Sequence, residues 1–455
     1  MFEVLPGFRD FYPEECRKRN YLFRRWSNWA RRFDFSEYDI PTLEPLELFT
    51  RKSGAEIVSQ LFHFEDQGGR AVALRPELTP SLARMVGSRI NSLKRPVKWF
   101  NIAENFRYER QQKGRLRSHY QLNADIFGEP GIHADADIQA LLISILKDFG
   151  FGSGDVKLRL SDRRIWSLFL EGLGFEGEAA LEVLSIIDKM ERLSAEGLME
   201  KLRPFFNEAV EDFLSSVDLL RSQRDLAGLR QAIERLCPTA SIKERAACRM
   251  AEWTELLESL EAYGVSDYLQ IDLGIVRGLA YYTGFVFEVF LQDEAGRPVG
   301  RALAGGGRFD HLVALLGYGD VPAVGFGMGD VVLADALEER GLMPPLIDVP
   351  DFYCVIGGPG ERPLALADAS SLRAMGYRVR YPLKLSGFGK QFKQAGQSGA
   401  RFALVYGSEE REHNLVKVRD LETGGETTLP RNHLMQQVPA LWSEGLAEPE
   451  KEKEK

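Results

Sequence analysis

Five polar side chains in the first third of the chain could together hold a phosphate and an amine. Arg107 and Glu109 fall on one face of a predicted strand, and Gln121 and Asp125 share one face of the next. Arg107 could neutralise a phosphate through paired hydrogen bonds. Glu77, Gln121 and Asp125 offer acceptor oxygens for an ammonium or another donor-rich ligand. For any isolated pair, two strands with surface salt bridges explain the same pattern. The basic loop between the strands favours a site for a nucleotide and an amine.

That loop lies in a strongly basic segment. Between Arg84 and Arg117 the chain carries ten Lys and Arg residues against only Glu104 and Glu109. Most such runs are solvated faces, but this one overlaps the candidate site and so favours a phosphate-rich partner. The connection 110–117 (RQQKGRLR) is longer than a common hairpin loop, and such loops are more often functional than accidental.

A second candidate element is Gly274–Val289 (GIVRGLAYYTGFVFEV). Two glycines bracket Arg277, and Tyr281 and Tyr282 precede an apolar strand. A glycine-rich entry lets the backbone approach a ligand, and an arginine there could contact an anion. The competing interpretation is an ordinary hairpin with an exposed arginine and two interfacial tyrosines.

Other motifs carry less information. The run Ala304–Asp310 (AGGGRFD) could cradle a phosphate or form a tight turn from sheet to helix; it has neither a P-loop lysine nor GxGxxG spacing. His119 and His311 are predicted to pack or to hydrogen bond rather than to bind a ligand. The spacing assembles neither a Ser/His/Asp nor a Cys/His set, and it predicts no metal site.

Length and composition predict a soluble protein of more than one domain. The chain has 455 residues, 44% of them apolar, and a net charge of −9. No apolar run approaches the ~20 residues of a membrane helix. The four cysteines lack CxxC spacing, which predicts neither a zinc site nor a disulfide framework, and a reducing cytoplasm fits best. The acidic balance argues mildly against a nonspecific nucleic-acid coat, but it leaves a local basic footprint possible.

The elements that must position these residues follow an α/β pattern. Pro13–Phe33 and His133–Phe149 are predicted helices, whereas Val97–Glu109 and Ser118–Phe127 alternate as strands. Proline interrupts Tyr38–Phe49, which is predicted to be an extended edge segment. Helical spacing dominates from about 165 to 263. The chain then returns to strands and, from Phe352, to a βαβαβ pattern with a parallel sheet.

The chain resembles the histidyl-tRNA synthetases, a family of class II aminoacyl-tRNA synthetases, over nearly its whole length. The opening LPGFRDFYPEE is similar to the family's N-terminal signature, and Pro41 matches the proline of class II motif 1. Residues 105–128 (NFRYERQQKGRLRSHYQLNADIFG) match motif 2, and 274–288 match the histidine-specific segment. GGGRFDHLVALLG and PAVGFGMGD match the run into motif 3, and the last α/β domain is similar to the anticodon-binding domain.

The resemblance implies a domain order and an assembly. The fold class would be α/β, with an antiparallel catalytic sheet flanked by helices. Residues 1–164 and 266–340 would form the two parts of the catalytic domain, 165–265 a helical insertion, 350–441 an α/β anticodon-binding domain, and 442–455 a disordered charged tail. The protein would be a cytoplasmic homodimer without a membrane segment, with motif 1 supporting the dimer interface.

The resemblance also implies the chemistry. Histidine and ATP, the latter as its Mg²⁺ complex, would give histidyl-adenylate, and the histidyl group would then pass to the 3′-terminal ribose of its tRNA. Arg107 and Arg277 would hold the α-phosphate from opposite sides as catalytic residues. The histidine-binding residues would be Glu77, Thr79, Gln121, Asp125, Tyr281 and Tyr282. ATP would contact Arg107, Glu109, Arg115, Arg277 and Arg308, and the tRNA acceptor end Arg110, Gln112 and Arg117.

Two positions depart from the family pattern. Asp125 stands where motif 2 usually has a glutamate. Val332 stands where motif 3 usually has the arginine that binds the γ-phosphate, and we hypothesise that Arg115 or Arg308 takes its place. Two alternatives remain: a synthetase-like regulatory subunit of histidine biosynthesis, and a noncatalytic tRNA-binding paralogue. The regulatory subunit typically lacks the anticodon domain and does not preserve the RGLAYYTG segment. This chain has both the domain and the segment.

Overall fold

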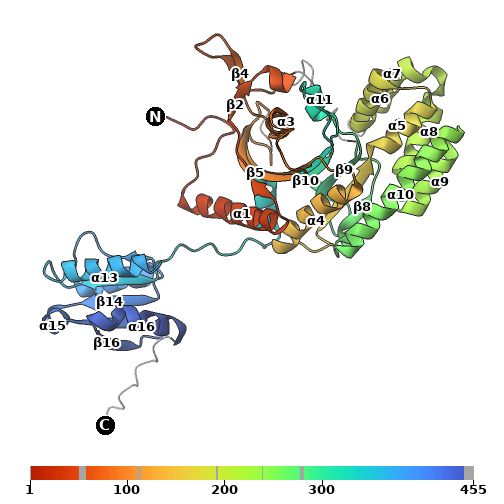
Figure 1. The fold of residues 1–455 in the computed structure, drawn as a ribbon. Helices are drawn as coiled ribbons and strands as arrows, with labels where there is room; N and C mark the ends of the chain where they lie inside the picture. Colours follow the sequence, from red (N-terminus) through yellow and green to blue (C-terminus); the bar gives the residue numbers. More distant parts are fainter. Residues whose placement is uncertain are drawn as a thin grey trace. The chain divides into compact units, whose positions relative to one another are not determined.

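The computed structural model divides into two compact units, Met1–Pro344 and Pro345–Lys455. It describes residues 2–50, 58–109, 112, 114–190, 193–237, 239–276 and 281–444. Figure 1 shows the elements of each unit.

The first unit is built on an eight-stranded sheet. The strands are, in spatial order, β1 (Ser36–Glu37), β5 (Val97–Phe106), β6 (Ser118–Phe127), β11 (Ala323–Gly329), β10 (Pro298–Arg308), β9 (Phe285–Gln292), β7 (Val156–Asp162) and β8 (Leu269–Ile271). The inner strands from β5 to β7 pair antiparallel, while β1 and β8 pair parallel at the two edges. The predicted antiparallel sheet of an α/β fold is therefore confirmed.

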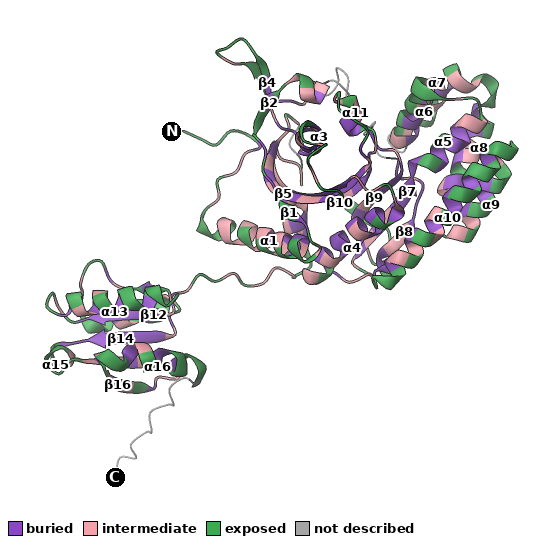
Figure 2. Ribbon diagram, viewed as in Figure 1, coloured by how far each residue is buried: buried purple, intermediate pink, exposed green. Residues whose placement is uncertain are grey.

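Helices cover both faces of this sheet (Figure 1). One face packs against α1 (Pro13–Arg32), α4 (Ile132–Asp148) and α12 (Asp330–Glu339), where Trp26 and Leu333 join Leu122 and Ala124 of β6 in one core. The other face curves around α3 (Thr79–Ser88) and the short α11 (Leu312–Leu315), which share a second core. Figure 2 shows the sheet as the buried layer between exposed helix surfaces.

The sequence explains why α1 forms and how it lies. Pro13 occupies the first helical position, where its missing N–H costs nothing, and Glu14 and Glu15 lie in the first turn, where acidic side chains suit the helix dipole. Leu22 and Trp26 are four residues apart and form a buried stripe on the sheet, as the periodicity predicted.

A small antiparallel sheet follows α1, in the order β2 (Leu43–Pro45), β4 (Ala71–Leu74), β3 (His63–Glu65). The predicted edge segment Tyr38–Phe49 supplies β2 and, from Glu47, the start of a helix that was not predicted. Pro45 is tolerated there because β2 has a partner on one side alone.

In the described part of the chain, six α-helices follow β7 in sequence and precede β8, its neighbour in the sheet. They are α5 (Arg163–Gly172), α6 (Gly177–Lys189), α7 (Ala195–Phe206), α8 (Val210–Arg221), α9 (Leu226–Leu236) and α10 (Ala240–Ala262). Four begin at a side-chain cap: Asp162, Ser194, Asp225 and Thr239 each accept a hydrogen bond from the first turn. No helix among the described residues is long and apolar enough to cross a membrane.

The second unit has a five-stranded sheet in the order β13 (Val379–Arg380), β12 (Phe352–Ile356), β14 (Phe402–Tyr406), β15 (Leu415–Asp420), β16 (Glu426–Pro430). Its helices are α13 (Arg362–Ala374), α14 (Phe388–Gln397), α15 (Ser408–Glu412) and α16 (Arg431–Glu444). The first three strands are parallel, as predicted, but β15 and β16 add an antiparallel hairpin that was not predicted. The sheet is therefore mixed, because the chain continues past the third parallel strand with a hairpin instead of another helical crossover.

Two predicted local structures are only partly correct. The strand expected at Val97–Glu109 ends at Phe106, because the backbone N–H of Glu109 turns back to Arg107 O at 2.8 Å. The run Ala304–Asp310 is not a phosphate loop, because its residues up to Arg308 end β10. The alternative of a turn from sheet to helix holds only for its end, where Asp310 lies in the turn that leads into α11. A Cβ atom on Gly306 would lie 2.2 Å from Gly325 O, so only glycine fits between the neighbouring strands.

Candidate active site

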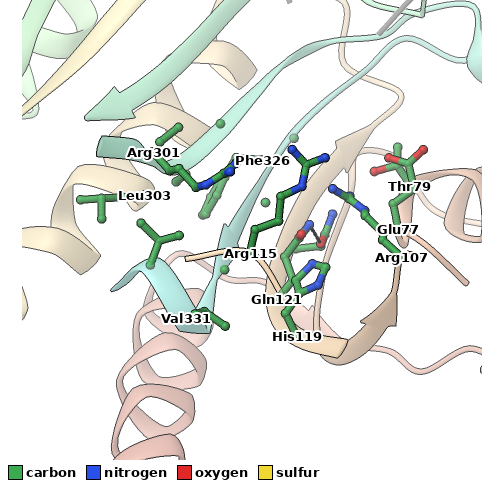
Figure 3. Close-up of a pocket in the computed structure, with 18 of the residues that line it drawn as sticks. Glu77, Thr79, Arg107, Arg115, His119, Gln121, Arg301, Leu303, Phe326 and Val331 are labelled. Carbon is green, nitrogen blue, oxygen red and sulfur yellow. Dashed lines mark hydrogen bonds between the residues drawn. The ribbon is translucent and has the colours of Figure 1, made fainter. Parts of the chain in front are cut away.

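A cavity of about 400 Å³ opens on the α3 face of the large sheet. It is lined from the start of α3, the segment after β5, strands β6, β10 and β11, and the start of α12. Of the predicted site residues, it brings together Glu77, Thr79, Arg107, Glu109, Arg115, Gln121, Asp125, Tyr281 and Tyr282. Figure 3 shows Glu77, Thr79 and Arg107 on one side, Arg301 and Leu303 on the other, and Arg115 and Gln121 between them. This volume suits an amino acid and part of a nucleotide.

The carboxyl group of Asp125 is buried at the base of this cavity. The residue is 1% exposed, and its Oδ2 has no hydrogen-bond partner among the described residues. Burial, reinforced by the negative charge of Glu77, raises the pKa of Asp125 well above its usual value. An unsatisfied buried acceptor costs free energy, so this position favours a ligand that brings a hydrogen-bond donor.

Two glycines of β11 make room for the polar side chains of β6. A Cβ atom on Gly325 would lie 2.0 Å from Asp125 Oδ1, and one on Gly327 would lie 2.2 Å from Gln121 Nε2. Gln121 is held in turn by Asn123, whose Oδ1 accepts from Gln121 Nε2 at 2.6 Å. The alternating glycines of GFGMG are the sequence signal of this close approach, and the predicted site did not include them.

Aromatic rings and one carboxylate form the wall beside Asp125. The rings of Tyr281 and Tyr282 lie 4.9 Å apart, and Tyr281 also packs edge-on against Phe309 at 5.8 Å. The Tyr281 hydroxyl donates to Glu77 Oε2 at 3.3 Å. This wall therefore combines flat apolar surface with polar groups, which suits a planar ring that carries an amine.

Arg107 brings positive charge to the same cavity. Its Nε donates to Pro76 O at 2.9 Å, which fixes the guanidinium beside the start of α3. The neighbouring His119 also lines the cavity. Burial, and secondarily the charge of Arg107, lowers the pKa of His119 to about 3, so its ring is neutral at physiological pH.

Glu109 and Arg115 form an ion pair at the cavity wall, with Arg115 Nε donating to Glu109 Oε2. In the same connection between β5 and β6, Gln112 and Arg115 form a backbone bridge. Gln112 is exposed, and Arg117 stacks on the ring of Tyr108 at 4.2 Å. Neither lines the cavity, which is consistent with a contact to a larger partner outside it.

Arg308 lies outside this cavity. It is buried and donates to Asp135, to the backbone oxygens of Glu129 and Gly131, and to Asp310. It lines instead a separate cavity of about 200 Å³ together with Asp135. This placement argues against the predicted ATP contact, because a guanidinium so fully engaged has little capacity left for a phosphate. The predicted residues Arg277 and Arg110 lie outside the described residues.

Arg301 is a cavity residue that was not predicted. It comes from β10, four residues before Gly305, and faces the cavity with Val332 of α12. The pairing of β9 with β10 shifts register between Val299 and Ala304, so the alternation of side chains that guides prediction from sequence fails here.

Solved structures share this fold. The crystal structure of histidyl-tRNA synthetase from Nostoc sp. PCC 7120 superposes with a TM-score of 0.76 at 24% identity, covering 97% of this chain and 99% of that one. A structure described as an ATP phosphoribosyltransferase regulatory subunit/histidyl-tRNA synthetase from Bacillus halodurans gives a TM-score of 0.70 at 25% identity, covering 87% and 96%. This likeness shows that the chain has the fold of these synthetase structures, which is that of the class II aminoacyl-tRNA synthetases.

Sequence comparison gives the family. The family model described as Histidyl-tRNA synthetase matches residues 7–329, and the Anticodon binding domain model matches residues 354–441. A histidine–tRNA ligase of Opitutus terrae is 50% identical over 450 residues, covering 97% of this chain and 99% of the relative. The chloroplastic/mitochondrial histidine–tRNA ligase of Arabidopsis thaliana is 38% identical, covering 92% and 83%. The chain belongs to the histidyl-tRNA synthetase family.

Proposed function

We propose that this protein is a histidine–tRNA ligase that works through a histidyl-adenylate. The observation that carries the proposal is the pairing of two features in one cavity. A buried Asp125 has an unsatisfied oxygen, and Arg107 is held at the same cavity by Pro76 O. The first suits the imidazole N–H of histidine, and the second suits the phosphate that histidine must attack.

Histidine would lie along the wall of tyrosines. Asp125 and Tyr282 would contact the two imidazole nitrogens, with Tyr281 beside them. Glu77, Thr79 and Gln121 would bind the α-amino group. Because both ring nitrogens would meet buried polar groups, an amino acid without them would leave those groups unpaired, and selection would not need an editing domain.

ATP would enter as its Mg²⁺ complex with its α-phosphate at Arg107. A carboxylate oxygen of histidine would attack the α-phosphorus, and the bond from that phosphorus to the bridging oxygen of pyrophosphate would break. Arg107, and from the resemblance Arg277, would stabilise the charge on the α-phosphate, while Glu109 would orient the adenine end. Such catalysis needs positioning and charge stabilisation and no covalent enzyme intermediate.

The second step would need the tRNA at two places. Arg110, Gln112 and Arg117 in the loop between β5 and β6 would contact the acceptor end. The second unit would bind the anticodon, in keeping with its match to the Anticodon binding domain. We further propose a homodimer in the cytoplasm, with residues 165–265 as a separate helical module between the two parts of the catalytic domain, residues 1–164 and 266–340.

Histidine-dependent ATP–pyrophosphate exchange, followed by aminoacylation of tRNA, tests the proposal. Exchange that requires histidine, and charging of the histidine tRNA alone, are expected. An absence of exchange at saturating substrates would contradict the activity and favour a regulatory subunit that only binds histidine. Exchange without charging would contradict the tRNA step.

A further inference from the structure

The β- and γ-phosphates of ATP need a cation in the protein, and motif 3 of this chain does not provide one. ATP as its Mg²⁺ complex still carries net negative charge on its β- and γ-phosphates, and motif 3 offers only Val332 at the position where a cation is expected. The described lining of the cavity includes three arginines: Arg107, Arg115 and Arg301. Arg308 is excluded by its burial against Asp135.

Arg107 and Arg115 are both committed elsewhere. Arg107 is fixed beside Pro76, at the end of the cavity that also holds Glu77 and Thr79. Arg115 is paired with Glu109, and this carboxylate cancels much of the field that a phosphate would experience. Neither is therefore well placed to take a second and third phosphate.

Arg301 lies at the opposite end of the cavity, beside Val332. A Cβ atom on Gly114 would lie 3.4 Å from Arg301 Cδ and 3.4 Å from Val332 Cγ2, so the two side chains flank the same point of the loop. In the view of Figure 3, Arg301 and Arg107 lie on opposite sides of the cavity, with Arg115 between them. A nucleotide whose α-phosphate is at Arg107 could therefore extend its remaining phosphates towards Arg301.

The guanidinium of Arg301 has a partner that is easy to exchange. Its Nη2 donates to the side-chain Oε1 of Gln112 at 2.5 Å, and that bond is exposed to solvent. Replacing a neutral amide oxygen with a phosphate oxygen strengthens the bond, because a charged acceptor roughly doubles the strength of a hydrogen bond. The planar fork of arginine also matches two phosphate oxygens at once.

We propose that Arg301 binds the β- and γ-phosphates of ATP and carries the role that Val332 leaves vacant in motif 3. This inference rests on the proposed function. As the bond between the α-phosphorus and the bridging oxygen breaks, its electron pair leaves on pyrophosphate, and Arg301 stabilises that charge. Binding of the phosphates to Arg301 replaces the hydrogen bond that Arg301 makes to Gln112.

Pyrophosphate-exchange kinetics test this role. Arg301→Ala is expected to raise the KM for ATP and for pyrophosphate by about 10- to 100-fold, the effect of losing a hydrogen bond to a charged group, with a much smaller change in the KM for histidine. Arg301→Lys is expected to be intermediate, since it keeps the charge but loses the fork. Arg297→Ala is the matched control, because Arg297 lies on the same hairpin and pairs with Asp293, outside the cavity.

A second variant tests the position. Adding Val332→Arg to Arg301→Ala returns a guanidinium to the same point from α12, and it is expected to recover part of the ATP affinity. Arg301→Ala kinetics equal to those of Arg297→Ala would overturn the inference.

Failure of the proposed function would be visible separately, as a wild-type protein without exchange. Calorimetric binding of pyrophosphate to the wild type and to Arg301→Ala would then still decide the role of Arg301, and equal affinities would overturn it.

Discussion

Gly325 and Asp125 lie so close that a Cβ atom on Gly325 would stand 2.0 Å from Asp125 Oδ1. Gly325→Ala is therefore expected to displace the carboxyl group and to raise the KM for histidine by about 10-fold or more, because leaving a buried polar group without its hydrogen bond costs ~1–3 kcal/mol. The KM for ATP should change less. Gly319→Ala is the control, since nothing lies within 4 Å of its Cβ position. Equal histidine kinetics in both variants would separate Asp125 from histidine binding.

Asp125→Asn should stabilise the free protein while it weakens histidine binding. The raised pKa of Asp125 means that the folded protein keeps this carboxyl protonated at pH values where the unfolded chain has ionised it. The wild type thus loses stability as the pH rises above about 4, and a neutral amide does not. Thermal unfolding should give the variant the higher Tm at pH 7.5, with the difference vanishing near pH 4. A difference that does not depend on pH would contradict the shifted titration.

His119→Asn should change the acid side of the stability profile. The pKa of His119 is lowered to about 3 in the folded protein. Below pH 6.5 the imidazole is therefore protonated in the unfolded chain but stays neutral in the folded protein. Between pH 7.5 and 5 the wild type should lose up to about 2 kcal/mol more than the variant. Urea unfolding followed by tryptophan fluorescence measures this in the first unit, where Trp26, Trp166 and Trp253 are buried. Parallel profiles would show that the His119 ring is protonated in the folded state.

Arg107→Ala and Tyr282→Phe should separate chemistry from recognition. Arg107→Ala removes charge at the reacting phosphate, and kcat for exchange should fall by about 10²–10³, the typical effect of losing one such donor. From the resemblance, Arg277→Ala should behave in the same way. Tyr282→Phe should mainly raise the KM for histidine. Steady-state exchange kinetics measure both parameters, and reversed effects would show that the two ends of the site are wrongly assigned.

Arg308→Ala should affect stability more than ATP binding. Removing Arg308 leaves Asp135 as a buried charge without its partner, which typically costs about 3–5 kcal/mol. The KM for ATP of the folded fraction should stay near that of the wild type. Arg340→Ala is the control, because its pair with Asp155 is partly exposed and such pairs are worth about 0–1 kcal/mol. A stable variant with a raised ATP KM would return Arg308 to the nucleotide site.

The sequence predicted the face of β6 well. Gln121, Asn123 and Asp125 alternate with apolar residues along a regular strand, and the structure confirms that the polar set lines the cavity while Leu122 and Ala124 enter the core. A period of two survives where a strand is paired without interruption on both sides, as β6 is with β5 and β11.

Prediction failed where the backbone departs from that period. The strand predicted to reach Glu109 ends at Phe106, although Glu109 still lines the cavity. Arg301 lies in a stretch of shifted register, so the direction of its side chain does not follow from spacing. Arg308 was misplaced for another reason. Its buried partner Asp135 comes from α4, more than a hundred residues away, and nothing local in the sequence announces that pair. Local sequence patterns do not show which charged residues pair across long distances in the chain.

During synthesis of the chain, β6 is complete long before its partner strand β11 has been made. β5 precedes β6 directly, but β11 is made about 200 residues later, which at about 5–20 residues per second leaves one edge of β6 open for roughly 10–40 s. An open strand edge invites wrong partners, and an inward-pointing charge is one of the devices that discourage them. Asp125, which costs the finished fold stability, would thus protect the unfinished one from aggregation during synthesis.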